Sequence, residues 1–149
     1  MPAWLLAITV LTGCGGVGRL PKVDLSAPGW QVWSGQALWK PSTGRPALAG
    51  ELLVAQHVNG DVLVSLSKPP VLLFTAQAAD GRWWIDVAER GRTYAGRGRP
   101  PERFVWFHIP DLLEGAPPPK HWKVSAPADG GWVLSHPETG ETIRLVLDQ

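Results

Sequence analysis

From residue 30 onward, the chain alternates short apolar segments with turn-forming residues. The segments begin near Trp30, Ala49, Asp61, Val71, Arg82, Arg92, His121, Trp132 and Glu141. Glycine-containing pairs such as Asn59-Gly60, Asp80-Gly81 and Thr139-Gly140 separate them. A spacing of about ten residues between turns is typical of antiparallel strands that follow one another in a meander. The pattern therefore predicts a mainly β domain over residues 30–149, built as a curved antiparallel sheet or half-open barrel.

Two of the turns also predict the register of their strands. Asn59-Gly60 favours a two-residue type I′ turn that pairs His57 with Val62, and Asp80-Gly81 in the same way pairs Ala78 with Trp83. Each hairpin then has one apolar face, so register and sidedness agree. The apolar face of the first hairpin contains Leu53, Ala55, His57, Val62, Val64 and Leu66. That of the second contains Leu72, Phe74, Ala76, Ala78, Trp83, Ile85 and Val87.

A single stretch, residues 100–114, has a helical pattern. Pro101 is acceptable in a first helical turn, whereas Pro110 must break or kink the helix, so two short pieces ending at Gly115 are expected. Packed on the apolar face of the sheet, this insert would act as a plug or lid. The residues expected to line an apolar cavity between sheet and lid are Leu53, Val62, Val64, Leu66, Leu72, Phe74, Trp83, Ile85, Val87, Phe104 and Phe107.

The N-terminus carries a different signal. An apolar run over residues 3–12 leads to Cys14, and Leu11-Thr12-Gly13-Cys14 resembles the lipobox of bacterial lipoproteins, in which the cysteine is acylated and becomes the first mature residue. The run is about ten residues long, which suits a signal peptide and falls short of the ~20 residues that span a bilayer. We therefore expect a signal peptide over residues 1–13, and the acylated cysteine with a flexible glycine- and proline-containing tether over residues 14–29. Because Cys14 is the only cysteine, no internal disulfide can form.

The charge and the tryptophan content of the chain indicate which classes of partner it binds. The net charge of +1 gives no reason to expect nucleic-acid binding. Nine tryptophans, of which only Trp4 precedes Cys14, either fill the core of a small β domain or line a site for an apolar ligand. A local excess of arginine is a possible patch for lipid headgroups or for an acidic protein, or else a set of solvated strand edges. The residues assigned to this patch are Arg90, Arg92, Arg97 and Arg99.

No set of residues indicates catalysis. The four histidines lack the spacing of metal ligands, and no GxSxG motif is present. The sequence therefore predicts no enzyme activity, no metal site and no cofactor. A hydrolase would require the fold to bring His108, His121 or His136 together with a carboxylate and a serine.

Several segments in order resemble the LolA/LolB family of lipoprotein carriers and receptors. They are Gly50-Glu51-Leu52-Leu53-Val54, Ser67-Lys68-Pro69-Pro70, Asp80-Gly81-Arg82-Trp83-Trp84, Phe104-Val105-Trp106 and the run from Ile109 to Gly115. The resemblance covers roughly residues 30–148. It implies a half-open β-barrel with a helical lid over an apolar cavity that holds acyl chains. The chain departs from the family by having one short insert and no long N-terminal helix.

Together these features predict a lipid-anchored, non-enzymatic module that binds an acyl chain, a lipoprotein or another apolar ligand, with a role in lipoprotein localisation. Gly15 follows Cys14 where some bacteria use aspartate to retain lipoproteins in the inner membrane. The expected location is thus the cell envelope, at the outer membrane facing the periplasm. The alternative is a structural envelope lipoprotein that binds a protein partner through its sheet edge and arginine patch.

Overall fold

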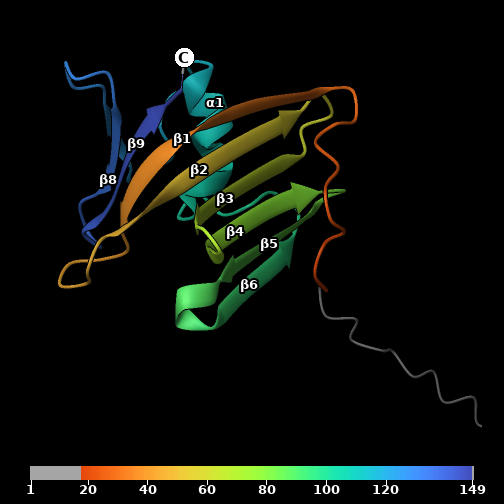
Figure 1. Cartoon of the computed structure of the whole chain (residues 1–149), viewed down its shortest axis with the longest axis horizontal. Coiled ribbons are helices and arrows are strands. Elements are labelled where there is room, and N and C mark those ends of the chain that lie inside the picture. Colours follow the sequence, from red (N-terminus) through yellow and green to blue (C-terminus); the bar gives the residue numbers. More distant parts are fainter. Residues whose placement is uncertain (1–17, 149) are drawn as a thin grey trace, which may run out of the picture.

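The protein is a single antiparallel sheet that curves around a short helical insert (Figure 1). The structure, a computed structural model, describes residues 18–148; the predicted signal peptide and Cys14 lie outside this range. The strands are β1 (Trp30–Lys40), β2 (Leu48–His57), β3 (Val62–Lys68), β4 (Val71–Ala79), β5 (Arg82–Val87), β6 (Arg92–Arg97), β7 (Lys123–Ser125), β8 (Trp132–His136) and β9 (Glu141–Leu147). Every strand begins within two residues of a predicted segment start, so the predicted meander is confirmed.

The sheet has the order β6-β5-β4-β3-β2-β1-β9-β8-β7 and does not close. Strands that follow one another in the chain are neighbours, except β6 and β7, which lie at opposite edges; β9 returns to pair with β1. The predicted curved sheet is therefore correct, with β6 and β7 as its two edges. Within the described residues, no helix has the length and hydropathy that a membrane span requires.

In the described part of the chain there are also three short helices: the 3₁₀ helices η1 (Ala88–Arg90) and η2 (Val105–His108), and the α-helix α1 (Ile109–Leu113). The last two form the lid, which packs on one face of the sheet, called here the lid face; the opposite face is the outer face. Residues 100–104 form a turn and not the predicted first helical turn. The rest of the prediction is confirmed, because Pro110 lies at the start of α1 and the lid ends at Gly115, whose φ is +91°.

The two predicted hairpin registers had different outcomes. Ala78 pairs with Trp83 across Asp80-Gly81, as predicted. Across Asn59-Gly60, however, Val62 pairs with Gln56 and not with His57. The peptide N–H of Gly60 donates to the His57 carbonyl at 2.8 Å, and Gly60 has φ +95°, so the turn contains one residue more than a type I′ turn.

This slip of one residue exchanges the faces of β2. Leu52 and Val54 occupy the lid face and are buried, whereas Leu53 and Ala55 lie on the outer face. A second irregularity occurs in β4, where the register with β3 shifts between Leu66 and Ser67. As a result Leu72 is 41% exposed. The assignments of Leu53 and Leu72 to the apolar cavity are therefore wrong.

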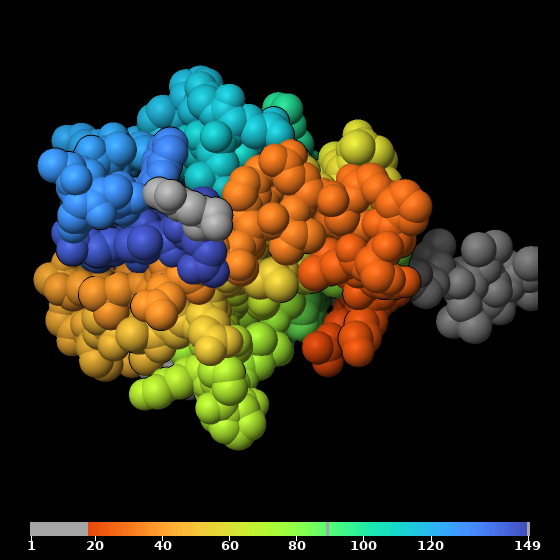
Figure 2. Space-filling view, turned by 45° about the horizontal axis from the view of Figure 1, so that its top comes forward, coloured from red at the N-terminus to blue at the C-terminus, as the bar shows by residue number. Residues whose placement is uncertain are grey.

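The segment before β1 is packed against the outer face and is not the free tether expected up to residue 29. Leu20 is only 4% exposed, and the Pro21 carbonyl accepts a hydrogen bond of 2.8 Å from Gln77 Nε2 on β4. The Arg19 guanidinium lies 5.1 Å from the centre of the Trp84 ring on β5. In the space-filling view this red segment lies directly on the body of the domain (Figure 2). The folded unit therefore begins before residue 30.

Candidate functional site

An aromatic-walled cavity of about 220 Å³ lies on the lid face, where the two ends of the unclosed sheet approach each other. Strands β5 and β6 and helix η1 form one side of it. The start of β9 and the β8–β9 turn form the other side, and the chain entering the lid covers it. The lining residues are Trp39, Pro41, Phe74, Ile85, Val87, Arg90, Tyr94, Arg103, Phe104, Trp106, His136, Thr139 and Glu141.

Three rings pack together at the inner wall. The Phe74 and Trp106 centroids are 4.7 Å apart, and Trp39 lies 5.6 Å from each, meeting Trp106 edge-on at 87°. This cluster joins β1, β4 and the lid. Because all three side chains are at most 4% exposed, the cavity has a rigid apolar wall.

The outer wall is also aromatic. Phe104 lies 5.4 Å from Tyr94 on β6 and 5.5 Å from Trp83 on β5, measured between ring centroids. The Arg103 guanidinium stacks 4.5 Å from the centre of the Phe104 ring. One cationic group is therefore held at the cavity by an aromatic ring that also forms its wall.

Glu141 is a carboxyl group inside this apolar cavity. It is the first residue of β9 and pairs with His136, so its side chain is on the lid face. Its Oε1 accepts a hydrogen bond of 2.9 Å from Trp39 Nε1. Burial raises the pKa of Glu141 to about 7, although the Trp39 hydrogen bond and the charge of Arg90 oppose the rise. The group is thus partly protonated near neutral pH, which lowers the cost of keeping it in an apolar site.

Arg90 faces Glu141 from η1 and is partly buried. Its Nε is buried and has no hydrogen-bond partner among the described residues. Arg90 and Arg103 therefore supply guanidinium groups at a cavity whose inner wall is apolar. Such an arrangement suits an amphiphile: an apolar tail against the rings and an anionic or polar head at the arginines.

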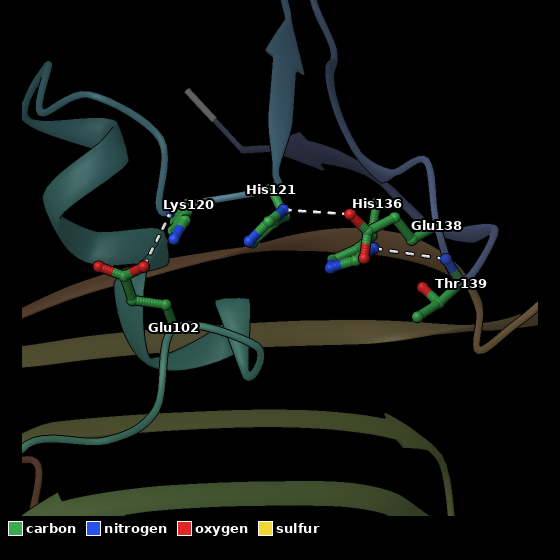
Figure 3. A network of polar contacts seen from close by, with 6 residues as sticks. All are labelled: Glu102, Lys120, His121, His136, Glu138 and Thr139. Atoms are coloured by element: carbon green, nitrogen blue, oxygen red, sulfur yellow. Dashed lines mark hydrogen bonds and ion pairs between the residues drawn. The ribbon is translucent and has the colours of Figure 1, made fainter.

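A polar network lies beside the cavity at the β8–β9 turn (Figure 3). His121 Nδ1 contacts Glu138 Oε1 at 3.2 Å, and the His121 and His136 rings stack with centroids 6.0 Å apart. The Thr139 peptide N–H donates to His136 Nδ1 at 3.4 Å, and Thr139 Oγ1 accepts from the Glu141 peptide N–H at 3.2 Å. Within residues 18–148, the hydrogen bonds and ion pair of this network involve histidine, glutamate and threonine, and none involves a serine. These contacts shape the turn that carries Glu141.

A second hollow, of about 600 Å³, opens on the other side of the lid. Its lining includes three consecutive prolines (residues 117–119) and charged side chains of both signs, among them Arg99, Glu102, Asp111 and Lys120. His108 also lines it, and burial lowers the pKa of this histidine. The larger hollow thus lacks the continuous apolar wall of the cavity around Trp106. Across residues 18–148, the side chain of Glu89 excepted, no three potential metal ligands of the His, Cys, Asp and Glu types lie close enough to hold an ion.

Apart from Leu53 and Leu72, the predicted cavity residues are distributed over three environments. Phe74, Ile85, Val87 and Phe104 line the cavity around Trp106. Val62 and Phe107 border the second hollow. Val64, Leu66 and Trp83 are buried in the core cluster beneath the lid. Most of the predicted interior therefore lies on the lid face, but much of it is filled by packing.

The four predicted patch arginines do not form one surface. Arg90 lines the cavity and Arg99 borders the second hollow. Arg92 pairs with Val87 and so has the register of the lid face, whereas Arg97 pairs with Arg82 and lies on the outer face. The prediction of a single arginine patch is therefore wrong. Side chains alternate between the two faces along β6, so Arg92 and Arg97 point to opposite sides of the sheet.

Several site residues escaped the sequence analysis: Trp39, Tyr94, Arg103, Trp106, His136, Thr139 and Glu141. The abundance of tryptophan was the one signal that pointed to some of them. Glu141 and Arg90 meet only because the ends of the sheet curve toward each other, and no local pattern contains that information. Comparison with protein-family models and with curated proteins gives no match.

Proposed function

We propose that this protein is a membrane-anchored, non-enzymatic module that binds an acyl chain or a similar apolar tail in the cavity beside the lid. The observation that carries the proposal is the cavity itself: aromatic walls, two arginines and one buried carboxyl at the open end of the sheet. The resemblance of the chain to LolA/LolB carriers and its lipobox-like Cys14 agree with a role in lipoprotein localisation at the outer membrane.

The size of the cavity limits what it holds. Drug-sized ligands occupy pockets of about 300–1,000 Å³. At about 220 Å³, the cavity accommodates a short chain or the end of a longer one. A complete acyl chain would require the lid to move away from the sheet. The proposal is therefore binding of one tail, with its polar head outside.

Dodecanoic acid brominated on its chain is a suitable probe, because bromine quenches tryptophan fluorescence on contact and Trp39 and Trp106 form the cavity wall. The folded chain should take up one molecule with quenching, and native mass spectrometry should show a one-to-one complex. The variant Val87→Phe places a larger side chain at the cavity wall, so it should lower the affinity by tenfold or more.

Leu53→Phe is the matched control, because it adds bulk on the outer face. It should retain the affinity of the unmodified chain. The proposal fails if the folded protein takes up no probe, or if Val87→Phe and Leu53→Phe bind it equally well. A structural lipoprotein that works only through a protein partner would give the first of these results.

A further inference from the structure

Three arginines gather around one tryptophan on the outer face of the edge strands β5 and β6, whose lid face lines the cavity. Arg82 on β5 pairs directly with Arg97 on β6, so the two side chains leave the same face side by side. Trp84 is the next outward residue on β5, and Arg19 stacks on its ring at 5.1 Å. We name this group, Arg19, Arg82, Trp84 and Arg97, the outer corner.

The three arginines of the outer corner outnumber the acids beside Arg82, since Asp61 and Asp80 line one hollow with it. Ion pairs between the described residues join His121 to Glu138 and Arg144 to Asp129, and neither includes these arginines. The nearest acid on the same face of β5 is Asp86, which accepts a hydrogen bond of 3.3 Å from Thr93 Oγ1. Asp80 lies in the exposed β4–β5 turn. Like charges directly opposite each other in a sheet are destabilising, so the Arg82–Arg97 pair is favoured by an external anion.

The position of the N-terminal segment indicates where that anion comes from. The chain is fixed on the outer face at Leu20 and Pro21, and Arg19 belongs to the outer corner itself. Gly18 lies four positions after Cys14, a span of at most ~14 Å. A lipid on Cys14 would thus hold the outer corner close to the membrane surface, and electrostatic attraction extends ~10 Å at 0.1 M salt.

We propose that the outer corner binds the anionic phosphates of the lipid headgroups around the anchor. The proposal rests on lipid attachment at Cys14, which is part of the proposed function. It adds to that function a defined orientation of the domain on the membrane. Ile85 and Tyr94 line the cavity from the lid face of β5 and β6, so the sheet would separate the cavity from the bilayer and the cavity would be open to the aqueous side.

The test uses the full chain carrying Cys14→Ser, so that no acyl group masks the contribution of the surface. Sedimentation with vesicles of phosphatidylglycerol and phosphatidylethanolamine is compared with sedimentation with phosphatidylcholine vesicles. Binding should favour the anionic vesicles and weaken in 0.5 M NaCl. Each arginine at an anionic surface contributes about fivefold, so Arg82→Gln with Arg97→Gln should lower partitioning by ~10–30-fold.

Arg45→Gln with Lys123→Gln is the matched control, because it removes the same charge from the β1–β2 turn and from β7, at the other end of the sheet. The apolar run before residue 14 is common to all variants, so its contribution to vesicle binding cancels when their partition coefficients are compared. The proposal is overturned if anionic and neutral vesicles bind equally, or if both double variants lose the same affinity. An acidic protein as the true partner would give no preference between the vesicles.

Uptake of the brominated fatty acid distinguishes this failure from failure of the proposed function. The Arg82→Gln, Arg97→Gln variant should take up the probe like the unmodified chain, because neither side chain lines the cavity. Its thermal stability should be equal or higher, since the replacement removes a like-charge pair. Loss of vesicle binding with intact uptake supports the outer corner, and intact vesicle binding refutes it.

Discussion

Glu141 shows how one side chain links the stability of the domain to its site. Its carboxyl group is partly buried in the aromatic-walled cavity and accepts a hydrogen bond from Trp39. Because burial raises the pKa to about 7, the folded state retains a proton that the unfolded chain releases near pH 4.5. The protein keeps an unfavourable group where an apolar one would stabilise it. Such a position is typical of a binding site.

The sign of the pH dependence follows from these two values. Below pH 4.5 the carboxyl group is protonated in both states, and its contribution to folding is complete. Between pH 4.5 and 7 the unfolded state ionises first, so the free energy of unfolding falls as the pH rises. The total loss is roughly 3 kcal/mol at most, and it is complete above pH 7.

Glu141→Gln should remove this dependence, because the amide keeps an oxygen for Trp39 and does not ionise. Urea unfolding at pH 5, 6.5 and 8 should show the variant gaining stability relative to the unmodified chain by roughly 2–3 kcal/mol over that range. Glu114→Gln, at an exposed position after α1, is the control and should follow the unmodified chain. If the free energy of unfolding changed with pH in the same way for the Glu141→Gln variant and the unmodified chain, the raised pKa would not belong to Glu141.

At the scale of elements, two similar turn signals gave one correct register and one slipped register. Asp80-Gly81 closes a hairpin whose register follows from the dipeptide. At Asn59-Gly60 the Val58 peptide N–H donates to the Gly29 carbonyl at 2.9 Å, and the His57 ring lies 3.0 Å from the Pro28 carbonyl. Contacts with a segment almost thirty residues away accompany the wider turn. Local sequence predicted the strands, and long-range contacts determined which face of β2 is buried.

Edge strand β6 depends on a glycine. Gly96 pairs with Trp83, and a Cβ at this position would lie 2.5 Å from the Trp83 ring. Gly96→Ala should therefore displace the ring from Phe104 and Phe107 and lower the free energy of unfolding by about 1–3 kcal/mol. Thermal denaturation and near-ultraviolet circular dichroism would measure both effects. Ala95→Val enlarges the neighbouring, exposed position on the outer face and should be nearly neutral; equal stability of both variants would refute the tight contact.

At the scale of the whole molecule, the meander, the lid and its break at Pro110 could all be predicted, because each has a periodic or steric signal in the chain. The docking of residues 18–29 could not. It depends on single features that have no periodicity: the burial of Leu20 and the hydrogen bond from Gln77 to the Pro21 carbonyl. The cavity could not be predicted from the sequence either, since it forms where the two ends of a nine-stranded sheet come together.

The docked segment sharpens the expectation for Cys14. In a Gram-negative host supplied with labelled palmitate, the unmodified chain should incorporate label and remain with the membrane fraction after a high-salt wash. Cys14→Ser should incorporate none. Any membrane association left to this variant through the outer corner is salt-sensitive, because it depends on screened charges.

The same variant should keep the thermal stability of the unmodified domain, because the first buried contact of the described chain is at Leu20, six residues beyond the cysteine. Thr12→Ser, a conservative change two residues before Cys14, is the control and should still be labelled. If the unmodified chain incorporated no label, lipid attachment at Cys14 would be refuted. The argument that lipid headgroups lie beneath Arg82 and Arg97 would then lose its basis. Binding of the fatty-acid probe would be unaffected, because the cavity lies on the other face of the sheet.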